Sequence, residues 1–146
     1  MLDQTTSEIV IEASRAQVMD VIADFGAYPQ WATGVKSCEV VETAAQGRAE
    51  QVRFVLDAAP IQDEYVLSYR WQDDSSVTWS LAEGGMIKGL DGAYVLEEQP
   101  GGATLVTYRL SVNLALPLIG LLRRKAEKVI IDAALKGLKK RVEADG

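Results

Sequence analysis

Residues 24–31 read DFGAYPQW and combine three aromatic side chains with Asp, Gly and Pro, which interrupt regular structure. A surface turn does not require Phe25, Tyr28 and Trp31, since large aromatic side chains are usually buried for most of their area. The stretch therefore either caps a hydrophobic core or forms one wall of a cavity. The distinction bears on function, because only a cavity can hold a ligand.

The sequence on either side of Asp24 predicts a helix–kink–helix elbow. Ser14 and Gln17 match the capping-box pattern, so we expect a helix that begins after Ser14 and ends near Ala23. Pro29 can occupy the first turn of a second short helix. Tyr28 precedes this proline, and we expect its backbone to avoid helical angles.

A first strand is expected over residues 4–12, and six strand-like segments follow the elbow. The links between these segments are short and rich in Gly, Pro and Asp, which favours antiparallel hairpins. Apolar and polar side chains alternate along several segments, so the sheet should have one apolar face and one solvated face. The six expected strands are 35–43, 50–58, 61–71, 76–83, 89–98 and 103–114.

A long amphipathic helix is expected from Pro117 to about Glu143. Its apolar arc is wide, which indicates that a curved sheet wraps around it. The predicted centre of this arc consists of Arg123, Glu127, Ile130, Ala134, Leu138 and Arg141. One flank is expected to carry Leu122, Ala126, Ala133 and Gly137, and the other Ile131, Leu135 and Val142.

The order of one strand, two short helices, six antiparallel strands and a long helix resembles the helix-grip fold of the START-like superfamily. Within it, the chain resembles small stand-alone actinobacterial members of the polyketide cyclase/dehydrase and lipid-transport family. The resemblance implies an α+β fold in which a seven-stranded curved antiparallel sheet wraps the C-terminal helix, and residues 1–146 form one ligand-binding domain. It rests on IVIEAS at 9–14, DFGAYPQW at 24–31, Gly92, Tyr94 and Leu96, GGATLVTY at 101–108, and LPLIGLLRRK at 116–125.

The resemblance also implies a cavity between the sheet and the long helix, with the elbow at its mouth. Tyrosines on the expected inner face support this, because a packed core favours aliphatic side chains and a buried tyrosine hydroxyl needs a partner. For any single ring, packing in the core is the more ordinary role, whereas the whole set of rings favours a cavity. The candidate ligand-binding residues are Phe25, Tyr28, Trp31, Tyr65, Tyr69, Trp71, Trp79, Tyr94, Tyr108, Leu122, Glu127, Ile130 and Ala134.

Glu127 is the one acidic residue at the centre of the apolar arc, where an unpaired charge is costly. Its carboxylate either faces the cavity, where it could meet a polar group of a ligand, or forms an ion pair at the rim with Arg123, one helical turn away. The lone cysteine, Cys38, lies on an expected strand, and we interpret it as a plain buried thiol.

Composition excludes several kinds of site. The chain has no histidine and one cysteine, which argues against a zinc site or a Cys–His nucleophile, and we expect no metal or cofactor. The net charge of −6 argues against a nucleic-acid partner.

We expect a cytoplasmic protein, since no signal peptide is visible. Residues 116–125 can make transient contact with a membrane. The basic residues of 123–141 fit an anionic surface as well, but a solvated basic face near a helix C-terminus is their more ordinary interpretation.

Three functions fit these observations. The first is binding or carriage of a hydrophobic small molecule such as a lipid, an isoprenoid or a polyketide-like ring. The second is catalysis as a polyketide aromatase/cyclase or dehydratase, which needs acid or base groups in the cavity. Only Glu127 and the tyrosines could supply them, so the sequence favours binding over catalysis. The third is a protein-interaction module, for which no specific motif is present.

Overall fold

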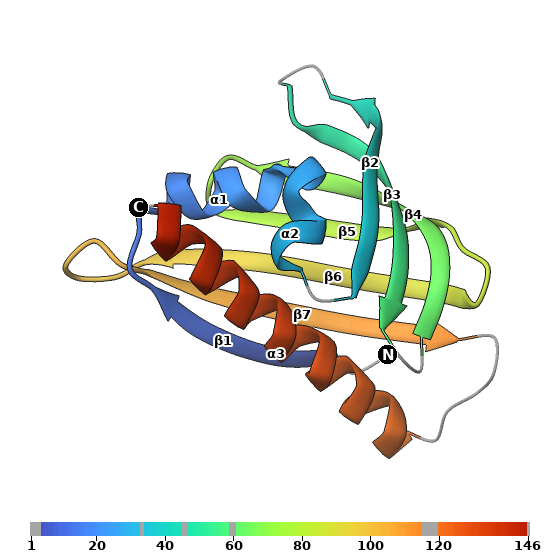
Figure 1. The fold of residues 1–146 in the computed structure, drawn as a ribbon. Coiled ribbons are helices and arrows are strands. Elements are labelled where there is room, and N and C mark those ends of the chain that lie inside the picture. Colours follow the sequence, from blue (N-terminus) through green and yellow to red (C-terminus); the bar gives the residue numbers. More distant parts are fainter. Residues whose placement is uncertain (1–3, 33, 45–46, 59–60, 115–119, 146) are drawn as a thin grey trace.

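The computed structural model describes residues 4–32, 34–44, 47–58, 61–114 and 120–145. Within them, one curved antiparallel sheet of seven strands wraps a long C-terminal helix, as predicted (Figure 1). The elements are β1 (Thr5–Ile11), α1 (Arg15–Ala23), η1 (Phe25–Ala27), α2 (Tyr28–Trp31), β2 (Val35–Thr43), β3 (Ala49–Ala58), β4 (Ile61–Gln72), β5 (Ser76–Glu83), β6 (Ile87–Glu98), β7 (Thr104–Leu114) and α3 (Gly120–Asp145).

The strand order is β1-β7-β6-β5-β4-β3-β2, so β1 and β2 are the two edges of the sheet. Strands β2 to β7 pair in chain order, as short hairpin links require, and β7 then pairs with β1. The segment α1–η1–α2 therefore crosses from one edge of the sheet to the other. Register shifts in β2, for example between Val40 and Glu42, accompany the bend of that edge.

The helical elbow forms as the sequence predicts, with one exception. Ser14 caps α1: its Oγ accepts a hydrogen bond from the Gln17 backbone, and the Gln17 side chain accepts one from the Ser14 backbone. The expectation that Tyr28 avoids helical angles is wrong, because its φ and ψ are −52° and −42°. Tertiary contacts override the local preference: the Tyr28 hydroxyl donates to the Ile22 carbonyl at 2.5 Å, and its ring packs on Phe25.

The buried side of α3 differs by a small rotation from the predicted arc. Ile131, Leu135 and Val142, expected at its flanks, are fully buried, whereas Ile130 and Ala134 are half-buried. The rotation arises because α3 packs mainly on β1, a strand at one edge of the sheet. The flank that carries Ile131, Leu135 and Val142 is therefore the one turned towards the sheet. The predicted start at Pro117 lies outside the described residues.

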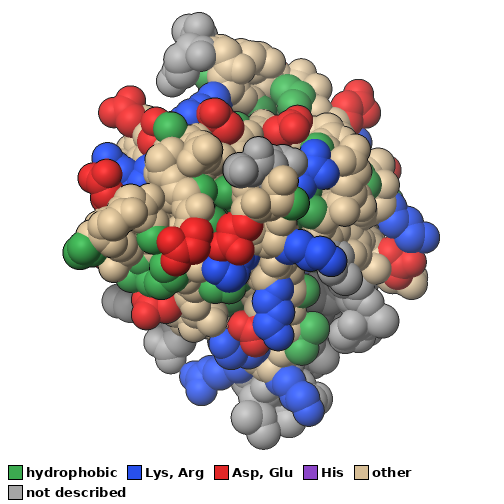
Figure 2. Space-filling model, turned by 60° about the vertical axis from the view of Figure 1, so that its left-hand side comes forward, with side chains coloured by type: hydrophobic (Ala, Val, Ile, Leu, Met, Phe, Trp, Pro, Cys, Tyr) green, Lys and Arg blue, Asp and Glu red, His purple; other side chains and the backbone are tan. Residues whose placement is uncertain are grey.

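The solvent-facing side of α3 is basic. Exposed residues on it include Lys125, Lys136 and Lys140, and Figure 2 shows basic side chains gathered in the lower half of one face. Lys128 and Lys139 pair with acidic residues one turn further along the helix. Among the described helices, none is long and apolar enough to cross a membrane.

Candidate functional site

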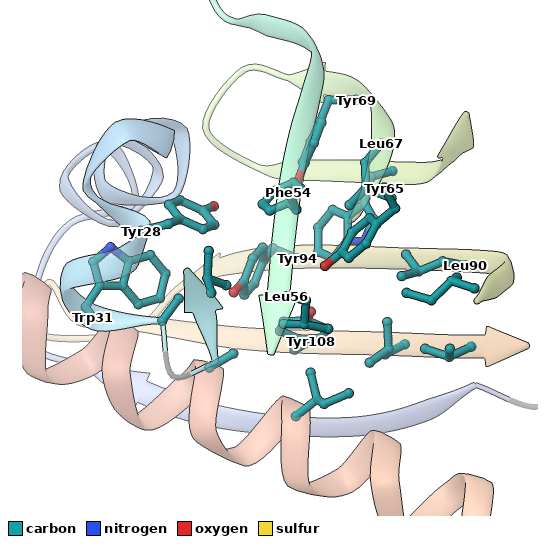
Figure 3. Close-up of a pocket in the computed structure, with 18 residues that line it drawn as sticks. Tyr28, Trp31, Phe54, Leu56, Tyr65, Leu67, Tyr69, Leu90, Tyr94 and Tyr108 are labelled. Carbon is teal, nitrogen blue, oxygen red and sulfur yellow. The ribbon is translucent and has the colours of Figure 1, made fainter. Parts of the chain in front are cut away.

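A cavity of about 100 Å³ lies between the concave face of the sheet, α2 and α3 (Figure 3). Most of the surface that lines it is apolar, and no Asp, Glu, Lys or Arg of the described residues is part of the lining. Nine predicted site residues line it: Tyr28, Trp31, Tyr65, Tyr69, Trp79, Tyr94, Tyr108, Ile130 and Ala134.

The sheet contributes a connected group of rings, because alternate residues of a strand point to the same face. Trp79 on β5 packs against both Tyr94 and Tyr108, with ring centroids 5.3 and 5.5 Å away, and the two tyrosine rings are 4.6 Å apart. Gly92 on β6 makes this arrangement possible, since a Cβ at that position would lie 2.3 Å from the Trp79 indole.

The elbow forms the wall of the cavity opposite the sheet centre. Tyr28 and Trp31 line it, and their ring centroids are 4.8 Å apart. Gly137 allows α2 to approach α3 closely, because a Cβ there would lie 2.3 Å from the Trp31 carbonyl oxygen. Phe25 lies behind this wall, where it is buried against Tyr28 and Tyr69. The DFGAYPQW stretch therefore both fills the core and forms a cavity wall.

The tyrosine hydroxyls of the cavity differ in their partners. Tyr28 donates to a backbone carbonyl, but the hydroxyls of Tyr65, Tyr69, Tyr94 and Tyr108 make no hydrogen bond with any described residue. Burial raises the pKa of all five hydroxyls above the usual tyrosine value. They therefore remain protonated and able to donate near neutral pH.

Glu127 takes neither of the positions that the sequence suggested. Its side chain is 1% exposed but does not line the cavity. Oε1 accepts a hydrogen bond from Thr5 Oγ1 at 2.6 Å, and Oε2 accepts one from the Val112 backbone at 2.7 Å. Arg123 donates weakly to Asn113 at 3.5 Å instead of pairing with this carboxylate. The buried charge is thus satisfied by strands β1 and β7.

One further candidate, Trp71, differs from expectation. Trp71 does not line the cavity, because β4 carries it past the cavity to the edge of the core, where its indole donates to the Ala49 carbonyl at 2.7 Å. Arg48 lies over its ring at 5.2 Å. The side chain of Leu122 lies outside the described residues.

Cys38 is half-buried, and burial raises the pKa of its thiol to about 12, which makes it a poor nucleophile.

The sequence did not single out most of the aliphatic lining residues or Phe54. The signal was present, since Phe54 and Leu56 alternate on β3, and Leu110 and Val112 continue the same face as Tyr108 on β7. These positions look like ordinary core residues in sequence, and only the tertiary arrangement separates lining from core. The missed lining residues are Ala32, Val35, Phe54, Leu56, Leu67, Ile87, Leu90, Leu110 and Val112.

The family model described as polyketide cyclase/dehydrase and lipid transport matches residues 3–143. The chain belongs to this family. Its architecture is the helix-grip fold that the sequence resemblance implied. No protein of curated function matches the chain in sequence.

Solved structures similar to this polyketide cyclase/dehydrase family member share the fold at low sequence identity. A START superfamily protein from Mycobacterium smegmatis is 21% identical with a TM-score of 0.91, covering 98% of this chain and 99% of the other. A protein from Thermus thermophilus is 24% identical with a TM-score of 0.82, covering 99% of each chain. The Zhui aromatase/cyclase from Streptomyces sp. R1128 is 14% identical with a TM-score of 0.76, covering 97% of this chain and 93% of the other.

Proposed function

We propose that the protein binds a compact hydrophobic small molecule in the cavity between the sheet and α3. The observation that carries this proposal is the cavity lining, which is apolar and aromatic and includes no charged side chain of the described residues. Such linings are typical of sites for small apolar ligands. Membership of a family described by lipid transport and polyketide cyclisation supports the same function.

The size of the cavity limits the ligand. An engineered protein cavity of roughly 150 Å³ binds benzene, so about 100 Å³ suits a single ring or a short branched chain. A larger lipid or polycyclic molecule would require displacement of α2, the short helix that carries Tyr28 and Trp31. Trp31 is half-buried, as expected for a residue at such an opening.

Catalysis as a cyclase or dehydratase finds less support at this site. Proton transfer needs a group whose pKa lies near the working pH. The ionisable groups of the described lining are tyrosines, and burial raises their pKa further from neutrality. Glu127 is engaged by Thr5 and Val112. We therefore favour binding without chemistry.

The test is binding of toluene, followed through the indole N–H resonances of Trp31 and Trp79 in two-dimensional NMR spectra. We expect saturable shifts in the wild type. Ala134→Phe places a phenyl ring where α3 lines the cavity and is expected to abolish them. Val129→Phe is the matched control, because Val129 is 62% exposed on the same helix, and this variant should bind as the wild type does.

Two outcomes would contradict the proposal. One is the absence of toluene-dependent shifts in the wild type, and the other is equal binding by Ala134→Phe. Native mass spectrometry of the freshly purified protein, followed by solvent extraction, would identify any ligand acquired in the cell.

A further inference from the structure

Four tyrosine hydroxyls at the cavity have no hydrogen-bond partner among the described residues. Tyr65, Tyr69, Tyr94 and Tyr108 line the cavity and are between 5 and 8% exposed. Their hydroxyl oxygens are not among the fully enclosed unpaired atoms of the described residues, so a molecule in the cavity can reach them. Because a hydroxyl in an apolar site gains from pairing, these four groups are available to a ligand.

Several buried polar groups elsewhere in the described residues have partners, whereas the Trp31 indole N–H at the cavity has none. The Tyr28 hydroxyl donates to the Ile22 carbonyl, the Trp71 indole donates to the Ala49 carbonyl, and the Thr104 hydroxyl donates to the Ala13 carbonyl. The four unpaired tyrosines come from three strands of the sheet: β4, β6 and β7. In Figure 3 the rings of Tyr65, Tyr69 and Tyr94 extend from their strands into the space that the lining encloses.

The chemistry of the lining discriminates between ligand types. Protonated tyrosine hydroxyls can donate to an acceptor oxygen and can also accept from a ligand hydroxyl. Neither lysine nor arginine lines the cavity among the described residues, so an ionised carboxylate would be buried without an opposite charge. Burial of an unpaired charge is far more costly than burial of a neutral polar group.

We infer that these four hydroxyls select a neutral ligand that carries a carbonyl or hydroxyl oxygen on a compact apolar body, and that the site rejects carboxylate ligands of the same size. The inference rests on the proposed function and specifies its ligand class.

The test compares three single-ring molecules of similar size: ethylbenzene, acetophenone and benzoate. NMR titration at neutral pH gives a dissociation constant for each from the Trp31 and Trp79 indole resonances. Acetophenone is expected to bind about three- to tenfold more tightly than ethylbenzene, the ratio that one net hydrogen bond produces. Benzoate is expected to bind at least about tenfold more weakly than acetophenone.

Tyr→Phe variants locate the effect, because they remove the hydroxyl and keep the ring. At least one of Tyr65→Phe, Tyr69→Phe, Tyr94→Phe and Tyr108→Phe should reduce the acetophenone-to-ethylbenzene ratio towards one. The melting temperature of that variant without ligand should be unchanged or higher. Tyr28→Phe is the control: it also lines the cavity, but its hydroxyl bonds with Ile22, so it should keep the ratio and lower the melting temperature.

The outcomes separate this inference from the proposed function. Equal affinity for ethylbenzene and acetophenone, or tight binding of benzoate, would overturn the inference and leave hydrophobic binding intact. Retention of the wild-type ratio by all four variants would also overturn it. If none of the three molecules binds, and toluene does not bind either, both the inference and the proposed function fail.

Discussion

Glu127 Oε2 lies 2.7 Å from the backbone nitrogen of Val112, a residue of the cavity lining, although the carboxylate itself is outside the cavity. The second oxygen of the same carboxylate accepts from Thr5 Oγ1 at 2.6 Å. Because β1 and β7 are neighbours in the sheet, one buried side chain joins α3 to both strands. Hydrogen bonds to a charged acceptor are short and strong, which suits this role.

Glu127→Ala is expected to destabilise the protein by about 1–3 kcal/mol, because it leaves the Val112 N–H and the Thr5 hydroxyl without their acceptor. Glu127→Gln should lose less, since an amide keeps one acceptor and nearly the same shape. Urea unfolding measures both values. Asp132→Ala, which removes only a partly exposed pair with Lys128, should change stability by about 0.5 kcal/mol or less and serves as the control. A stabilised Glu127→Ala protein would contradict this interpretation.

Gly137→Ala should destabilise the protein even though alanine is favoured over glycine within a helix by about 1 kcal/mol. The added Cβ would lie 2.3 Å from the Trp31 carbonyl oxygen, so α2 must move away from α3. Overpacking of this kind typically costs about 1–3 kcal/mol. Unfolding curves and Trp fluorescence of the folded state provide the measurement, with the exposed neighbour Lys136→Ala as the control. A gain in stability would show that the two helices are not in close contact.

Gly92→Ala and Gly89→Ala form a matched pair on β6. A Cβ at Gly92 would lie 2.3 Å from the Trp79 indole, whereas one at Gly89 would lie 3.2 Å from the end of the flexible Asn113 side chain. We expect Gly92→Ala to displace Trp79 into the cavity, to cost about 1–3 kcal/mol and to weaken toluene binding. Gly89→Ala should be close to wild type in both stability and binding. Similar effects for the two variants would be inconsistent with the packing of Trp79 on Gly92.

The five tyrosines of the chain should remain un-ionised until the protein unfolds in alkali. Burial raises the pKa of each above the value of 10.0 that applies in the unfolded chain. The raised pKa means that the native state holds protons more tightly, so stability is fully present below about pH 10 and decreases as the pH rises beyond it.

Ultraviolet difference absorbance of tyrosinate, recorded together with circular dichroism, checks this expectation. The absorbance and the loss of secondary structure should change in one cooperative transition above about pH 10. Guanidinium-unfolded protein is the control and should titrate near the ordinary tyrosine pKa. A gradual change in the native protein, with the circular dichroism constant, would show that at least one hydroxyl is accessible to solvent.

Local patterns in the sequence were sufficient to predict most of the fold. The alternation along 61–71 and 76–83, the turn residues between strands and the Ser14 cap are all determined by near neighbours, and the structure confirms them. The predicted inner face was also correct, which is why Tyr65, Tyr69, Trp79, Tyr94 and Tyr108 do line the cavity.

Features that depend on distant residues were not predictable. The partners of Glu127 include Thr5, which lies 122 positions away in the sequence. The helical angles of Tyr28 accompany contacts that a rule about the residue before proline does not include, among them ring packing on Phe54 of β3. Trp71 shares a strand face with Tyr69, but the extent of the cavity along β4 depends on which elements cover that face.

The pairing of β1 with β7 also has a kinetic consequence. Strands β2 to β7 can pair as successive hairpins, whereas β1 must reach β7 from the opposite end of the chain, as the pairing of Thr5 with Leu110 shows. Closing such a long loop costs entropy before its contacts form, and proteins with many non-local contacts fold slowly, on the order of milliseconds to seconds. During refolding, strand formation is therefore expected to precede the ability to bind a ligand, because the walls of the cavity meet only when this closure is complete.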